Sequence, residues 1–191
     1  MTLHADALSG GYTDAPTQSA RAFRAILEAM ARPGTIHTVA GAAPPAPLSL
    51  AAGVALLTLT DPTTPLHLAG KADCQPVRDW VAFHIGAPLV AAEKATFALG
   101  TWDALQPVTR FKIGQPDYPD RSATLIVEVD RLTNHGPALT GPGIALATWL
   151  NLPETAAFRA NRALFPLGFD CLFTVGAQLA GLPRSTRVEK I

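Results

Sequence analysis

The segment of residues 124–129, Thr-Leu-Ile-Val-Glu-Val, constrains the fold of this chain more than any other part of the sequence. Leucine, isoleucine and two valines make it too apolar for a strand that is half exposed at the edge of a sheet. We therefore expect it to lie in the centre of a sheet. Residues 170–175, bounded by Gly168 and Gly176, form a second candidate for a buried strand.

A first amphipathic helix is expected near the amino terminus. Asp14 can cap it, and Pro16 fits its first turn. Its end is expected at Arg32-Pro33-Gly34, because proline biases the preceding residue away from helix and glycine accepts the following turn. The apolar residues that recur at helical spacing are Ala20, Phe23, Ile26, Leu27 and Met30.

Further short strands and helices alternate along the chain, which favours an α/β layered fold. No repeat or detachable linker divides it, so residues 1–191 are expected to form a single domain, and residues 106–121 an irregular surface stretch. The expected helices are a mostly buried one at 48–60, one capped by Asp73 and closed by Gly86, and one at 154–164. The expected additional strands are 36–39, 66–68 and 96–99.

The composition excludes some functions and suggests association. Lys plus Arg and Asp plus Glu are both 15, so the chain lacks the basic excess of a dedicated nucleic-acid binder. Charged residues make up 16%, against about 25% in typical soluble domains, which suggests burial in a homodimer or larger assembly.

Neither a membrane span nor a signal peptide is expected. Prolines at 44, 45 and 47 interrupt the uncharged stretch of residues 35–60 before it reaches the length of a membrane span. His4 and Asp6 stand where a signal peptide would be basic or apolar, so the protein is expected in the cytoplasm.

The sequence offers no strong metal or cofactor motif. Its five histidines lack ligand spacing, and Cys74 and Cys171 are expected to be plain buried thiols. A pyridoxal enzyme would need a protected lysine, for which Lys71 is a better candidate than Lys94, Lys112 or Lys190. Phosphate-binding, dinucleotide-binding and hydrolase motifs are also missing.

Three local segments carry more specific possibilities. In residues 139–144, Gly141 and Gly143 flank a proline, which suits either a tight structural turn or close approach of an anion or another chain. In residues 165–170, Phe165-Pro166-Leu167-Gly168-Phe169-Asp170, Asp170 stands at the mouth of a strand as a turn carboxylate or as a paired buried acid facing a site.

The third segment is residues 182–189. If it is extended, Arg184 and Thr186 share one face, where they could hold a phosphate or a partner's carboxylate, or simply form a solvated strand end. We expect Arg184 to lie near the turn of residues 140–143, at one edge of the sheet, and to form a surface for a phosphate-bearing ligand or a partner. An exposed Arg184 would contribute little to folding.

Together, Arg32-Pro33-Gly34 and these three segments resemble, in order and spacing, the H subunit of the bacterial carbon-phosphorus lyase core complex. The resemblance covers nearly the whole chain, with residues 87–121 the least comparable part. It places the motif positions of the family on Arg32, Gly34, Thr140, Gly141, Gly143, Phe165, Pro166, Gly168, Asp170, Arg184 and Thr186.

The resemblance implies a role in phosphonate degradation, in the step that transfers a phosphonate onto the ribose C1 of ATP and releases adenine. It implies G, I and J subunits as partners, a functional link to the L subunit, and a homodimer. It also implies a fold like the large domain of pyridoxal-phosphate transferases, without that or any other cofactor. The alternatives are a free-standing pyridoxal-type enzyme that uses Lys71, and a pure scaffold.

Overall fold

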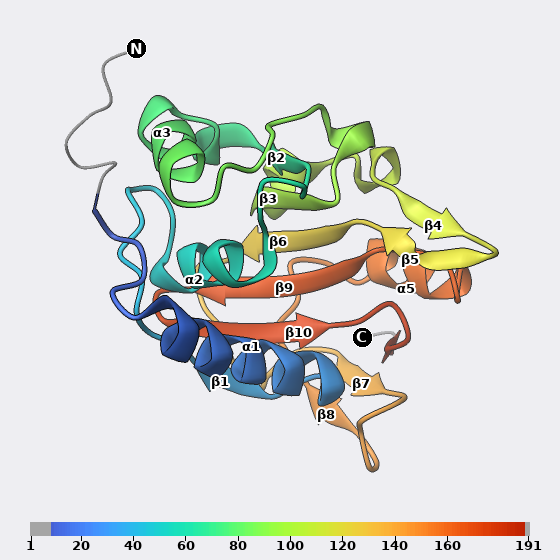
Figure 1. Ribbon diagram of the computed structural model, residues 1–191. Coiled ribbons are helices and arrows are strands. Elements are labelled where there is room, and N and C mark those ends of the chain that lie inside the picture. The colour runs from blue at the N-terminus through green and yellow to red at the C-terminus, as the bar shows by residue number, and fades with distance from the viewer. Residues whose placement is uncertain (1–8, 190–191) are drawn as a thin grey trace.

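The computed structural model describes residues 9–189, which fold around a six-stranded mixed sheet (Figure 1). The helices are α1 (Ala15–Ala31), α2 (Leu50–Leu59), α3 (Gln75–His84), α4 (Trp102–Leu105) and α5 (Ala156–Ala163), with 3-10 turns at Gly70–Ala72, Ala92–Lys94 and Val108–Arg110. The strands are β1 (Ile36–Thr38), β2 (Leu66–Leu68), β3 (Phe97–Thr101), β4 (Ile113–Gln115), β5 (Tyr118–Ser122), β6 (Thr124–Glu128), β7 (Ala138–Thr140), β8 (Thr148–Trp149), β9 (Asp170–Val175), β10 (Gln178–Leu182) and β11 (Arg187–Val188).

The main sheet has the strand order β1-β10-β9-β6-β3-β2. Strands β2, β3, β6 and β9 are parallel to one another, and β10 and β1 add antiparallel to β9. The central position expected for residues 124–129 is confirmed, because β6 lies between β3 and β9. The α/β class is confirmed as well, with a mixed sheet.

Helices and a small sheet cover the two faces of the main sheet. Figure 1 views it from the side of α1 and α2, which together with α3 pack against one face. Helices α4 and α5 pack against the other face, beside a three-stranded sheet of order β11-β7-β8. Successive side chains of β6 point to opposite faces of the sheet. Ile126 therefore packs in the first layer, and Leu125 and Val127 pack in the second.

Most predicted elements are confirmed, but some details were wrong. Residues 106–121 are not irregular throughout, because β4 and β5 pair there as a hairpin. Asp14 stands at the start of α1 without a side-chain capping bond, and the cap of α3 falls on Cys74 instead of Asp73. The carboxylate of Asp73 binds Arg78 instead, at 2.6 Å.

The buried stripe of α1 also differs from the prediction. Ala22, Ile26 and Ala29 face the core, whereas Phe23 and Leu27 are 50% and 54% exposed. Small alanines let the helix lie close to the sheet, and this rotates the larger side chains outward. The outward-facing side chains of α1 are therefore available for contact with another molecule.

The two cysteines have different surroundings. Cys171 is buried, and burial raises the pKa of its thiol well above the ordinary value, so this thiol stays protonated and unreactive. Cys74 is only half-buried, so the expectation of a buried thiol was wrong for that residue. No helix within residues 9–189 is long and apolar enough to cross a membrane. His4, Asp6 and Lys190 lie outside the described residues.

Candidate functional site

A cavity of about 490 Å³ lies at the carboxyl ends of β3 and β6. These strands are parallel neighbours, so their last residues, Thr101 and Glu128, reach the same edge of the sheet. In open α/β proteins, ligands bind outside the carboxyl ends of the strands. The position therefore identifies this cavity as the candidate functional site. Its walls are formed by residues 101–103, 128–131 and 151–153.

Glu128 is the acidic group held most firmly at this cavity. Its Oε1 accepts the backbone N–H of Ser49 at 2.7 Å, and its Oε2 accepts the hydroxyl of Thr174 at 3.1 Å. Ser49 is the N-cap of α2, so the carboxylate lies at the positive end of that helix. Burial raises the pKa of Glu128 above its usual value, while the hydrogen bonds from Ser49 and Thr174 oppose the rise. This carboxyl group takes up a proton more readily than an exposed glutamate.

The other charged groups of the cavity remain free to meet a ligand. Asp103, Asp130 and Arg131 are exposed, and no ion pair joins them to a residue in the described part of the chain. Asn151 holds one wall in place, because its side chain accepts from the N–H of Thr133 and donates to the carbonyl of Arg131. Carboxylates suit the hydroxyl or amino groups of a ligand, and the guanidinium suits an anionic group.

Sequence reasoning missed this cavity. The available signal was the position of Glu128 and Asp130 at the end of the clearest strand, where the carboxyl edge of a parallel sheet would place them. Lys71, the candidate for a pyridoxal site, is exposed, as are Lys94 and Lys112. The pyridoxal alternative therefore lacks a protected lysine among residues 9–189. No group of three His, Cys, Asp or Glu side chains suited to a metal occurs in that range either.

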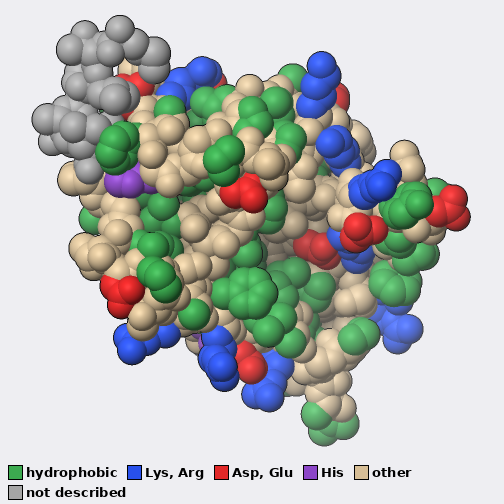
Figure 2. Space-filling view, in the orientation of Figure 1, with side chains coloured by type: hydrophobic (Ala, Val, Ile, Leu, Met, Phe, Trp, Pro, Cys, Tyr) green, Lys and Arg blue, Asp and Glu red, His purple; other side chains and the backbone are tan. Residues whose placement is uncertain are grey.

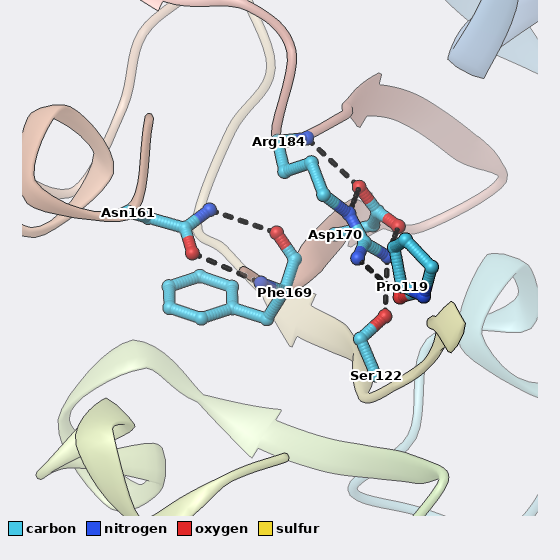
Figure 3. A network of polar contacts seen from close by, with 6 residues as sticks. All are labelled: Pro119, Ser122, Asn161, Phe169, Asp170 and Arg184. Carbon is cyan, nitrogen blue, oxygen red and sulfur yellow. Dashed lines mark hydrogen bonds and ion pairs between the residues drawn. The ribbon is translucent and has the colours of Figure 1, made fainter. Parts of the chain in front are cut away.

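Asp170 and Arg184, which the sequence singled out, form an ion pair at the opposite end of the sheet (Figure 3). Asp170 begins β9 and lies beside Thr124, the first residue of β6. Its Oδ1 accepts both the backbone N–H of Arg184, at 2.8 Å, and the Nε of its side chain, at 3.1 Å. The guanidinium also binds the carbonyl of Pro119, at 2.7 Å, and the hydroxyl of Ser122. The pair is therefore an internal connector of β5, β9 and the turn after β10.

These contacts correct two expectations about the carboxyl-terminal segment. Arg184 is not a solvated strand end, since its side chain is only 12% exposed. The segment is not extended over residues 182–189, because the N–H of Thr186 binds the carbonyl of Pro183 in a turn before β11. The hydroxyl of Thr186 is buried without a hydrogen-bond partner in the described chain. Asp170 is paired and mostly buried, as one of its two alternatives predicted, but its partner is a group of the fold itself and none of the described cavities is lined by this residue.

The glycines of the motifs serve close packing of the backbone. Gly143 has φ +80°, and a Cβ there would overlap the carbonyl oxygen of Ala31, at the end of α1. Gly141 lies against the backbone of Ser185 and Thr186, and a Cβ on Gly34 would overlap the side chain of Thr148. The four segments thus form one continuous set of contacts between α1, the small sheet and β9.

The structure does not form the expected surface in which the side chain of Arg184 lies beside the turn of residues 140–143. Arg184 directs its guanidinium to Asp170, Ser122 and Pro119, and none of the described contacts joins it to the turn. Thr140 instead pairs with Arg187, and its hydroxyl donates to Glu189 at 3.4 Å.

Two other motif residues lie on the surface. Arg32 is exposed and pairs with Glu28 at 3.4 Å. Phe165 is half exposed, and Arg162 covers its ring at 4.8 Å from the centroid. Gly168, by contrast, is packed against Asn161, whose side chain both accepts from and donates to the backbone of Phe169 (Figure 3).

The fold and the site define a mixed α/β protein with a ligand-sized cavity at the carboxyl edge of its parallel strands. Residues 10–189 match the family model described as "Bacterial phosphonate metabolism protein (PhnH)". The chain is 36% identical over 199 residues to the alpha-D-ribose 1-methylphosphonate 5-triphosphate synthase subunit PhnH of Rhizobium meliloti (strain 1021), with all of both chains covered. It is 31% identical over 186 residues to the putative C-P lyase subunit protein HtxG of Stutzerimonas stutzeri, covering 92% of this chain and 87% of that protein. The chain therefore belongs to the PhnH family, and the resemblance drawn from the four segments is confirmed.

The Arg184→Ala variant tests the internal role of the Asp170–Arg184 pair. We expect the free energy of unfolding to fall by about 2–4 kcal/mol, because the substitution leaves the mostly buried Asp170 carboxylate without its cation. Arg187→Ala is the matched control. Arg187 is exposed and its side chain has no partner in the described chain, so about 0.5 kcal/mol or less is expected. Urea unfolding measures both, and equally small losses would contradict the internal role.

The Glu128→Gln variant tests the burial of Glu128. The pKa of this carboxyl is higher in the folded than in the unfolded chain, so its contribution to stability is fully present below the unfolded pKa and is lost as pH rises through the folded pKa. The glutamine can keep the bond from Ser49. We therefore expect the free energy of unfolding of the variant, minus that of the wild type, to increase from pH 4 to pH 8. A difference that stays constant or decreases over this range would show that burial does not dominate.

Proposed function

We propose that this chain is a subunit of a bacterial C-P lyase complex and acts in the synthesis of alpha-D-ribose 1-methylphosphonate 5-triphosphate. The observation that carries the proposal is the match along the full length of both chains with the Rhizobium subunit of that name. The second relative, a putative C-P lyase subunit, supports the same assignment.

The reaction proposed for the complex transfers a phosphonate onto the ribose C1 of ATP and releases adenine. In this proposal the chain acts with G, I and J subunits and is linked in function to an L subunit. The cavity at the carboxyl ends of β3 and β6 favours a subunit that contacts a ligand over a pure scaffold, because Asp103, Asp130 and Arg131 leave free charged groups there. The proposed fold relationship is to the large domain of pyridoxal-phosphate transferases, supported by parallel strands between two covering layers, and the proposed location is the cytoplasm.

Reconstitution of the complex tests the proposed function. Adenine release from ATP in the presence of methylphosphonate is expected from the complete complex, and neither from the isolated chain nor from the complex prepared without it. Liquid chromatography of the reaction mixture measures the adenine. Release by the isolated chain, or undiminished release without it, would contradict the proposal.

We also propose that the chain alone is a homodimer. Trp149 and Phe165 are about half exposed and Leu146 is 89% exposed, so large apolar side chains remain that a second copy can cover. Light scattering of the purified chain at micromolar concentration is expected to give twice the mass of the chain. A particle with the mass of one chain would contradict this.

A further inference from the structure

Strand β1 leaves one edge of the main sheet open. Within residues 9–189 it pairs only with β10, and the hydrogen bond from the Val39 N–H to the Ala177 carbonyl shows which backbone groups of β1 point toward β10. Because hydrogen-bonded and non-hydrogen-bonded pairs alternate in an antiparallel ladder, the N–H and C=O groups of Ile36 and Thr38 point away from β10. No other segment in residues 9–189 pairs with them. The opposite edge is different, since residues 88–90 cover β2 through bonds to Leu66.

A groove runs between this open edge and α1. One part, of about 610 Å³, is lined by Arg21, Arg24, Glu28 and His37, and an adjoining part, of about 290 Å³, by Arg21 and Thr38 among others. Glu28 is already paired with Arg32. Arg21 and Arg24 are exposed, and no ion pair or hydrogen bond engages either guanidinium in the described chain. The groove therefore presents two free positive charges beside free backbone groups.

An apolar surface adjoins this basic groove. Phe23 and Leu27, four residues apart on α1, are half exposed and lie on the outward side of the helix. Figure 2 shows a green patch over α1, with blue Lys and Arg side chains gathered below it along the border of the molecule. Backbone edge, positive charge and apolar side chains thus occur together on one side of the protein.

We propose that an extended acidic segment of another protein subunit adds to β1 as a further strand and places its carboxylates against Arg21 and Arg24. Backbone-to-backbone pairing satisfies the groups of Ile36 and Thr38, which a small anion cannot do along the strand. Charge complementarity selects an acidic partner. A second copy of this chain is disfavoured at this edge, because its own Arg21 and Arg24 would bring like charges into the shared groove.

This inference rests on the proposed function, since it states where a partner of the complex binds. The proposed occupant of this edge is a protein segment. A free nucleotide, which also carries negative charge, is the competing occupant of the groove and is tested separately.

Two variants test separately how the charge of the groove and the backbone edge of β1 contribute to binding. Arg21→Glu combined with Arg24→Glu reverses the charge of the groove, and Thr38→Pro removes an outward N–H that makes no bond within the sheet. The matched control is Arg159→Glu combined with Arg187→Glu, because both arginines are exposed, lack side-chain partners in the described chain and belong to the layer on the other face. Thermal unfolding of each variant identifies any that fails to fold.

The experiment measures binding of the purified chain to the other subunits of the C-P lyase complex at about 50 and 300 mM salt. We expect the charge-reversal and proline variants each to weaken binding at least about tenfold at low salt, and the control to bind like the wild type. We expect binding of the wild type to weaken at the higher salt concentration. Binding of the charge-reversal variant should depend less on salt.

The possible failures are distinct. If the wild type joins none of the subunits, the proposed function itself is contradicted. If the wild type joins them and both variants bind equally well, this inference is overturned while the proposed function stands. If only the charge-reversal variant loses binding, the proposed pairing of an added strand with β1 is overturned. Saturable binding of ATP that Arg21→Glu with Arg24→Glu abolishes, with assembly unchanged, assigns the groove to a nucleotide and also overturns the inference.

Discussion

The arrangement around the amino ends of the parallel strands depends on the ion pair of Asp170 with Arg184. One carboxylate holds both the backbone and the side chain of Arg184, and the same guanidinium reaches Ser122 and Pro119, more than 60 residues earlier in the chain. Both charges are mostly buried, at 12% and 19% exposure, so neither can be left without the other at low cost. The turn after β10, the start of β9 and the hairpin of β4 and β5 are thereby fixed relative to one another.

The motif glycines extend this arrangement through close packing of the backbone. Gly143 packs on the end of α1 and Gly141 on the turn that carries Arg184, so the small sheet is held between them. The glycines and the arginine that suggest an anion-binding site in the sequence therefore serve the internal packing of the fold. Among residues 9–189, two surfaces that the motif residues do not occupy are the cavity at the carboxyl ends of β3 and β6 and the open edge at β1. These two surfaces lie outside the motifs that identify the family.

The sequence was sufficient to predict the elements whose patterns are local. The apolar run of β6 predicts a central strand without knowledge of its neighbours, and Arg32-Pro33-Gly34 follows directly on the end of α1. Contacts between segments that are distant in the chain could not be predicted from the sequence. Nothing near Arg184 in the chain shows that Ser122 and Pro119 surround it, and nothing near Glu128 shows that Ser49 binds it. The face of α1 was misjudged for the same reason, because alanines allow a closer approach than the larger side chains that hydropathy favours.

In this account, the open edge at β1 is used for assembly, whereas the contacts around Asp170 and Arg184 serve internal structure. Amide hydrogen exchange, measured on the free chain and within the assembled complex, tests this division of roles most directly. The amides of Ile36 and Thr38 are expected to exchange fast in the free chain and to become strongly protected in the complex, whereas amides around Asp170 and Arg184 are expected to be protected equally in both. Unchanged exchange at Ile36 and Thr38, with new protection around Asp170 and Arg184 instead, would contradict this account.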